Sequence, residues 1–232
     1  MKKLLILFLL TNLIPTISVN AQGWFWPEET INGEFSMGYF GKTIASNDEG
    51  TIVAVAMNME MVNVYDMSSG FPVQLGSTIT GYNNSFASFV ESMSIDDEGN
   101  TLVIGSDTDG GDYRGLAQIY EYDGNSWNLE TSFTGEATYD QMGRSVSISG
   151  DGTRVALAAT LNDGTASLAG HVRVFEKDIY GYWNQLGSDI DGDAYADYFG
   201  TSISLSDDGN RLIISSPFHD SYSGHAKVFE YS

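Results

Sequence analysis

The chain has 232 residues, of which 31 are acidic and 10 are basic, so its formal net charge is −21 at pH 7. This negative field repels nucleic acid and anionic membranes, so we expect neither as a partner, and it favours cations or basic proteins. Because the chain contains no cysteine, it forms no disulfide and carries no lipid on a cysteine, and its stability must come from packing.

The N-terminus has the pattern of a secretory signal peptide. Lys2 and Lys3 form a basic start, residues 4–14 form an apolar run, and Val19 and Ala21 are small residues at the positions that a signal peptidase reads. The apolar run is about half as long as a bilayer span requires, and no later segment approaches that length.

We therefore expect residues 1–21 to be removed and residues 22–232 to form the working domain. The protein is expected to be exported, to the extracellular space, the cell surface or the periplasm, and to have no membrane span.

One sequence pattern occurs four times along the rest of the chain. Its copies read "FGKTIASNDEGTIVAVA", "FVESMSIDDEGNTLVIGS", "MGRSVSISGDGTRVALAA" and "FGTSISLSDDGNRLIISSP", and they begin at Phe40, Phe89, Met142 and Phe199. In each copy, two segments rich in β-branched and alternating polar residues flank a turn that ends in glycine. The pattern predicts a β-hairpin in every copy.

A third predicted strand follows each hairpin, as in "VNVYD", "AQIYEY", "VRVFEK" and "AKVFEY", and a fourth strand follows three of these. The fourth strands read "FPVQLGSTITG", "WNLETSFTG" and "WNQLGSDIDG". Another copy, "WFWPEETING", stands at the start of the predicted domain, where Trp24 precedes Gly33 as Trp183 precedes Gly192. No segment has convincing helical periodicity with caps. We therefore expect sixteen strands in four sheets of four.

Four-stranded repeats of about 50 residues are typical of propeller blades. The unpaired first strand of the domain is able to complete the last sheet, which hides both sheet edges and closes a ring. The sequence therefore predicts an all-β fold, a four-bladed β-propeller of antiparallel blades closed by its N-terminal strand.

The repeats resemble the FG-GAP family, which is found in integrin-type propellers and in many exported bacterial proteins. The segment "W-x-QLG-x-x-I-x-G" at Trp183 looks like a bacterial branch of that family, and residues 215–217 loosely match its GAP position. The resemblance covers nearly all of residues 22–232 and implies the propeller fold, whereas it says little about function. The FG pair is matched by Phe40-Gly41 and Phe199-Gly200 and, in degraded form, by Phe89-Val90 and Met142-Gly143.

Integrin-like members of the family hold calcium in an acidic loop between the first two strands of a blade. In this chain, the corresponding turns around Glu49, Glu98, Asp151 and Asp208 are short and offer too few oxygen ligands for a calcium shell. We therefore expect no metal and no cofactor in these loops.

The segment "DIDGDAYAD", residues 189–197, has the acidic spacing of an EF-hand loop. It lacks the glycine that the sharp turn needs, because Ala194 stands there, and Gly200 occupies the place of the bidentate glutamate. We interpret it as a strand that leads into an acidic connection, in which Asp193 and Asp197 remain able to share an incidental cation.

Carboxylates and aromatic rings are frequent in the loops between strands 2 and 3 and in the connections between blades, which share one face of a propeller. Acids accept hydrogen bonds from sugar hydroxyls while a ring covers the apolar face of a sugar, so we predict that this face binds glycans or cell-surface proteins. The alternative is that the rings fill gaps between blades. The predicted contact residues are Asp109, Tyr113, Asp163, Asp197, Asp220 and Tyr222.

The position after the FG pair holds Lys42, Glu91, Arg144 and Thr201 in the four repeats. In a propeller these residues surround the channel mouth. We expect ion pairs between adjacent blades, with an anion site at Lys42 and Arg144 as the alternative.

The sequence offers little support for catalysis. His171 and His225 occupy the same repeat position after a glycine, which indicates a structural role, and no serine or cysteine nucleophile is marked near His219. We therefore expect a monomeric binding or adhesion module. An extracellular glycosidase or lyase with a propeller frame and a purely structural surface protein remain the alternatives.

Overall fold

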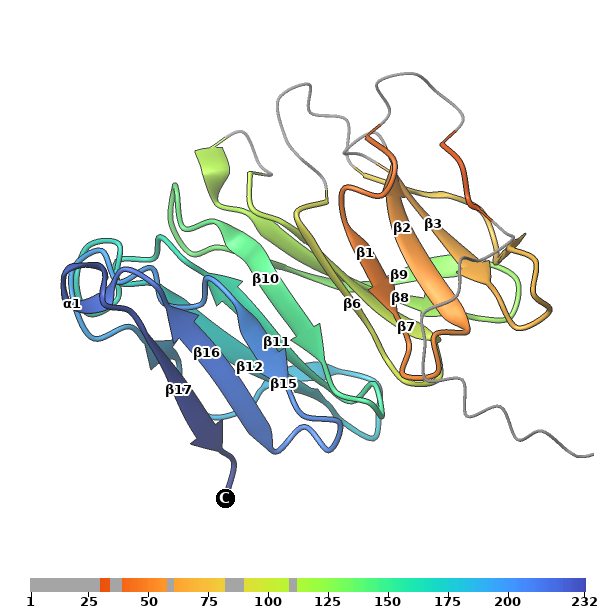
Figure 1. The fold of residues 1–232 in the computed structure, drawn as a ribbon. Helices are drawn as coiled ribbons and strands as arrows, with labels where there is room; N and C mark the ends of the chain where they lie inside the picture. Colours follow the sequence, from red (N-terminus) through yellow and green to blue (C-terminus); the bar gives the residue numbers. More distant parts are fainter. Residues whose placement is uncertain (1–29, 34–38, 58–60, 82–89, 109–111) are drawn as a thin grey trace, which may run out of the picture. The chain divides into compact units, whose positions relative to one another are not determined.

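The regular secondary structure in the described part of the chain is almost entirely β (Figure 1). It forms four antiparallel sheets and one turn of four residues, labelled α1 (His219–Tyr222). This confirms the all-β prediction. The predicted signal peptide and most of the predicted first strand lie outside the described residues. The computed structural model describes residues 30–33, 39–57, 61–81, 90–108 and 112–232.

We name the sheets A to D in chain order; in each of them the strands follow one another antiparallel. Sheet A contains β1 (Ile44–Ser46), β2 (Ile52–Met57), β3 (Met61–Asp66), β4 (Val73–Gln74) and β5 (Ile79–Thr80). Sheet B contains β6 (Ser92–Ile95), β7 (Thr101–Ser106), β8 (Leu116–Tyr122) and β9 (Trp127–Thr134). Sheet C contains β10 (Met142–Ile148), β11 (Arg154–Ala159), β12 (His171–Lys177), β13 (Trp183–Gln185) and β14 (Ile190–Asp191). Sheet D contains β15 (Ile203–Leu205), β16 (Arg211–Ser216) and β17 (His225–Glu230).

The outer strand is continuous in sheet B and divided in sheets A and C. β4 and β5 both pair with β3, and β13 and β14 both pair with β12. The interruptions fall at Gly76 and Gly187, whose φ angles of +67° and +75° lie in the left-handed region that glycine adopts without strain. Sheet B has no glycine there, and β9 continues through a bulge. Sheet D has three strands within the described residues, so its predicted fourth strand is not part of the described structure.

Three hydrophobic clusters lie between consecutive sheets, from A to D. Strand β7 shows how the sequence produces this arrangement, because alternate side chains of a strand point to opposite faces. Leu102 and Ile104 pack in the cluster of sheets A and B, whereas Val103 packs in the cluster of sheets B and C. The inner sheets therefore need apolar residues on both faces.

Sheet D differs, because β16 alternates between buried and exposed residues and Ile213 is 47% exposed. No cluster among the described residues joins sheet D to sheet A. A closed ring of sheets is therefore not shown.

Hydrogen bonds to backbone carbonyl groups also connect the first hairpins of the four sheets in order. The Asn47 side chain donates to the carbonyl oxygen of Asp97 at 3.1 Å, and the Asp97 N–H donates to the carbonyl of Gly150 at 2.9 Å. The Gly150 N–H in turn donates to the carbonyl of Asp207 at 2.9 Å. The four turns are thus linked from sheet A to sheet D.

The electrostatics of the same turns agree with this linkage. Loss of hydration and the carboxylates of Asp207, Asp48 and Asp151 raise the pKa of Asp97. One carboxylate from the turn of each of the other three sheets is therefore close enough to Asp97 to repel its negative charge.

Candidate functional site at the loop ends of sheets C and D

The loop between the second and third strands of one sheet lies beside the connection to the next sheet. In sheet B, the N–H of Tyr139 donates to the carbonyl of Asp112 at 3.0 Å. At the equivalent place in sheet C, the N–H of Ala196 donates to the carbonyl of Ser167 at 3.0 Å. Loops and connections therefore share one end of the sheets, which is the arrangement that the repeat pattern predicts.

Exposed aromatic rings gather on these segments. The rings of Tyr113 and Tyr139 stack with their centroids 5.5 Å apart and their planes 13° apart, and they are 40% and 60% exposed. In sheet D, Phe218 makes edge contacts with Tyr198 and Tyr222 at centroid distances of 5.0 and 5.5 Å. Some rings therefore contact one another as well as solvent.

A buried aspartate organises the connection into each of sheets C and D. Asp140 accepts the N–H of Ala137 at 2.8 Å, and Asp197 accepts the N–H of Ala194 at 2.9 Å. Each aspartate is nearly inaccessible to solvent, at 3% and 2% exposure. An aspartate that receives the N–H three residues earlier in the chain closes this connection in both sheets.

The same two aspartates each receive a second side chain from the loop of their sheet. Asn162 donates to the carboxylate of Asp140 at 3.3 Å, and Nδ1 of His219 lies 3.0 Å from the carboxylate of Asp197. Asn162 and His219 occupy the same place three residues after the end of the second strand. Sheet D thus carries an imidazole where sheet C carries an amide.

In sheet D, this imidazole lies beside a second one and a carboxylate. The rings of His219 and His225 have their centroids 4.0 Å apart, and one ligand atom each of Asp193, His219 and His225 lies within 4.8 Å of the other two. Lys227 forms an ion pair with Asp193, and its hydrogen bond holds the pKa of Asp193 below the usual range. Asp193 is exposed and both histidines are partly exposed, so solvent reaches the group.

The equivalent group in sheet C consists of Glu136, His171 and Asp189, whose ligand atoms also lie within 4.8 Å of one another. Arg173 lies among them, with Nη2 2.5 Å from Glu136 Oε1 and 2.6 Å from Asp189 Oδ2. Its hydrogen bond holds the pKa of Asp189 below the usual range. Burial, followed by the nearby Arg173, lowers the pKa of the fully buried His171. A guanidinium therefore supplies the positive charge in sheet C.

The predicted contact residues lie in different environments in the structure. Tyr113 is stacked on Tyr139, and the exposed Asp163 accepts the N–H of Leu168 at 2.8 Å. Asp220 and the 79% exposed Tyr222 lie in the turn α1. Asp109 lies outside the described residues.

The prediction for Asp197 needs a correction, since this residue is buried and cannot present its carboxylate to a large ligand. Its oxygens are engaged by Ala194 and His219. The repeat pattern does not predict the grouping of His219 with His225, although the two residues are only six positions apart across a loop.

The three charged residues that follow the FG position are brought together. Lys42 Nζ lies 2.9 Å from Glu91 Oε2, and Arg144 Nη1 lies 2.8 Å from Glu91 Oε1 and 3.0 Å from Asp107 Oδ2. Burial raises the pKa of Asp107, and the hydrogen bond from Arg144 opposes this shift. These contacts join sheets A, B and C.

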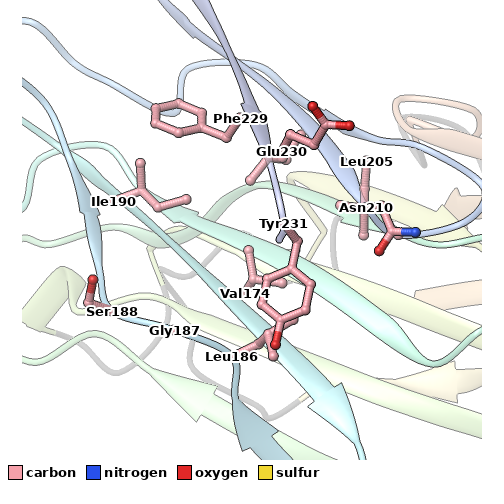
Figure 2. Close-up of a pocket in the computed structure, with 12 residues that line it drawn as sticks. Val174, Leu186, Gly187, Ser188, Ile190, Leu205, Asn210, Phe229, Glu230 and Tyr231 are labelled. Carbon is pink, nitrogen blue, oxygen red and sulfur yellow. The ribbon is translucent and has the colours of Figure 1, made fainter.

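An apolar groove of about 190 Å³ lies between sheets C and D, next to the edge strand β17 (Figure 2). The residues that line it, labelled in Figure 2, include Val174, Leu186 and Ile190 from sheet C and Phe229 and Tyr231 from the C-terminal segment.

The matching position between sheets A and B is filled by Trp127. Its Nε1 donates to the carbonyl of Leu75 at 3.1 Å, and its ring lies against Gly76, where an added Cβ would come within 3.3 Å of the ring. Leu186 and Gly187 of the groove are the counterparts of Leu75 and Gly76. An added Cβ at Gly187 would meet no atom within 4 Å.

A comparison with protein-family models gives no match, and a comparison with curated proteins gives none either. The resemblance to FG-GAP repeats therefore rests on the residues quoted above. Among the described residues, no helix has the length and apolar character that a membrane crossing requires.

Proposed function

We propose that the chain is an exported four-bladed β-propeller of the FG-GAP type that binds glycans through the loop end of its sheets. In this proposal, residues 22–33 supply the outer strand of sheet D and close the ring of sheets. Lys42, Glu91 and Arg144 then surround the mouth of the central channel. Different observations support the closure of the ring and the binding of glycans.

The groove between sheets C and D supports the closure. In the first interface, the tryptophan that begins the outer strand of sheet B fills the space against Leu75 and Gly76. Trp24 holds the corresponding position in "WFWPEETING". A tryptophan at the groove would cover Leu186 and Gly187 and bury the apolar surface of Phe229. Pairing with β17 would also give hydrogen-bond partners to the backbone N–H and C=O groups along the edge of sheet D.

The linked hairpins support the same closure from the other end of the sheets. The bonds from Asn47 to Asp97 and from Gly150 to Asp207 order the first hairpins of all four sheets. First strands that line a common axis would place these turns together, as blades of a propeller do.

The stacked pair of Tyr113 and Tyr139 is the observation that carries the glycan proposal. Polar groups hold this pair in position: Arg114 pairs with Asp112 at 2.6 Å, and its Nη1 donates to the carbonyl of Glu136 at 2.7 Å. A ring face with fixed carboxylate and guanidinium groups beside it suits a sugar, which has an apolar face and hydroxyl edges.

The test is binding of the purified protein to a broad glycan array, with Tyr113→Ala and Tyr139→Ala as variants. Both substitutions should abolish binding to the selected glycans, because each removes one ring of the stacked pair. Tyr180→Ala is the matched control, since Tyr180 is 78% exposed but lies in the turn between the third and fourth strands of sheet C. Binding that survives both loop substitutions contradicts the proposed surface, and a blank array contradicts glycan binding and favours a cell-surface protein as the ligand.

A further inference from the structure

We propose that Asp193, His219 and His225 form a binding site for a divalent transition metal ion, with Zn²⁺ as the best match. This site does not include the stacked tyrosines, so the test of metal binding is independent of the test of glycan binding. Nothing in the repeat pattern requires it, because sheet C builds the same connection without a second histidine.

The geometry of the three side chains is the first argument. They approach from different segments: Asp193 from the connection into sheet D, His219 from the turn α1, and His225 from the start of β17. One ligand atom of each lies within 4.8 Å of the other two, and the two imidazole centroids are 4.0 Å apart. Bonds of about 2.0–2.2 Å to one ion would draw the three atoms closer together, and the exposed side chain of Asp193 has room to move.

The hydrogen bonds of the histidines are the second argument. Nδ1 of His219 lies 3.0 Å from the carboxylate of Asp197, and in the tautomer in which Nδ1 donates this hydrogen bond, Nε2 keeps its lone pair for an ion. A buried carboxylate behind a histidine is the usual outer partner of a metal-bound imidazole, because it fixes the tautomer and the orientation of the ring. The ring of His225 has no hydrogen-bond partner among the described residues, and its Nε2 is buried.

Sheet C provides an internal contrast. There, Asn162 replaces the imidazole of His219, and the guanidinium of Arg173 lies between the carboxylates of Glu136 and Asp189. In sheet D, the basic residue at the same place is Lys227, whose ion pair within the described part of the chain is with Asp193. Lysine is a single point charge on a flexible stem, so a divalent ion displaces it more readily than it displaces a forked guanidinium.

The donor set selects the kind of ion. Imidazole nitrogens suit Zn²⁺ and its neighbours, whereas Ca²⁺ prefers a shell of six to eight oxygen atoms. Three protein ligands leave at least one position of a tetrahedral shell for water or for a further ligand. Because the ligands are partly exposed, an ion can enter from solvent.

The experiment is titration of the purified, chelator-treated protein with Zn²⁺ in competition with a chromophoric indicator, followed by Co²⁺ as a spectroscopic probe. We expect one saturable Zn²⁺ site, and a Co²⁺ absorption spectrum typical of nitrogen and oxygen ligands. Millimolar Ca²⁺ should not displace either ion.

Three variants separate this site from weak surface binding. His219→Asn should abolish site-specific binding while the protein stays folded, because asparagine makes the corresponding hydrogen bond in sheet C. Asp197→Asn should weaken Zn²⁺ binding by about 10- to 100-fold, as expected for an outer partner of a ligand histidine. Lys227→Met should strengthen binding, because it frees Asp193.

Glu136→Gln is the matched control in sheet C and should leave the affinity for Zn²⁺ unchanged. The proposal is overturned if the wild-type protein does not bind Zn²⁺, or if His219→Asn, shown to be folded by circular dichroism, binds it as tightly as the wild type. An unchanged or weaker affinity of Lys227→Met would contradict the placement of the ion on Asp193.

Discussion

Sheets C and D share several side-chain contacts at their loop ends, but they differ in the residues that complete these contacts. In both sheets, a buried aspartate closes the connection, and a basic residue in the third strand pairs with the acidic residue after a glycine. Sheet C completes this set with an amide and with a forked guanidinium that pairs with both Glu136 and Asp189. Sheet D completes it with the imidazole of His219 and with Lys227, and this is the set proposed above to bind a divalent ion. The same backbone arrangement thus carries different chemical groups in the two sheets.

The two sheets also differ at their outer edge. The third strand of sheet C is covered by β13 and β14, whereas β17 of sheet D is an edge among the described residues. Half of the side chains of β17 are therefore exposed, including Val228 at 65%. The apolar groove between sheets C and D lies beside this edge.

The largest expected effect comes from giving sheet C the side chains of sheet D. The double substitution Asn162→His and Arg173→Lys should create a second transition-metal site, because it supplies an imidazole and removes the guanidinium from Glu136. Zn²⁺ titration should then saturate at about two equivalents per chain instead of about one, since a complete ligand set is what binding requires.

Asn162→His alone is the control for this prediction. Arg173 still neutralises the carboxylates of Glu136 and Asp189 in that variant, so its stoichiometry should stay that of the wild-type protein. A folded double variant that binds no additional Zn²⁺ would show that the two groups are not equivalent.

A smaller effect is expected at the aspartates that the two sheets share. Asp140→Ala and Asp197→Ala each leave a backbone N–H and a side-chain group without their acceptor, so each should lower the free energy of unfolding by about 1–3 kcal/mol. Urea denaturation in the presence of a chelator measures this loss. When Zn²⁺ is added, wild-type protein and Asp140→Ala should gain stability, whereas Asp197→Ala should gain much less. If Zn²⁺ increased the free energy of unfolding equally in both variants, Asp197 would not be the outer partner of a metal-bound His219.

The smallest effect concerns pH and His171. Because burial lowers the pKa of His171 in the folded protein, the unfolded chain takes up a proton below its own pKa of about 6.5 while the folded protein does not. The stability that the neutral ring contributes is therefore complete above about pH 6.5 and declines below it, by at most about 1.4 kcal/mol per pH unit.

His171→Leu tests this contribution, since Leu116 occupies the same position in sheet B. Urea denaturation between pH 7.5 and pH 5 should show a flatter pH dependence for the variant than for the wild-type protein. Identical slopes would mean that His171 does not titrate differently in the two states.

The sequence predicts the strands of this protein well because their signals are local. Alternation in segments such as "SISLS" and the aspartate-glycine turns fix the hairpins without reference to the rest of the chain. The division of the outer strands is less predictable. It depends on glycine φ angles at Gly76 and Gly187 and on what packs against them.

The chemistry of the loops is predicted only in part, for a physical reason. Asp197 stands in an acidic, aromatic segment that favours exposure, and only the folded connection turns its carboxylate towards Ala194 and His219. The approach of His219 to His225 depends on the turn between them, in which Asp220, Ser221 and Tyr222 adopt left-handed φ angles of 46°, 56° and 73°. Such angles carry a conformational cost for residues other than glycine, so no local rule anticipates them.

The most direct test of the account is a comparison of Trp24→Ala with Trp127→Ala by urea denaturation. Trp127 fills the interface between sheets A and B, so its removal should cost about 3–5 kcal/mol. If Trp24 fills the groove between sheets C and D and closes the propeller, Trp24→Ala should show a loss of similar size. A Trp24→Ala protein that unfolds like the wild type, while Trp127→Ala is destabilised, would contradict the closed propeller.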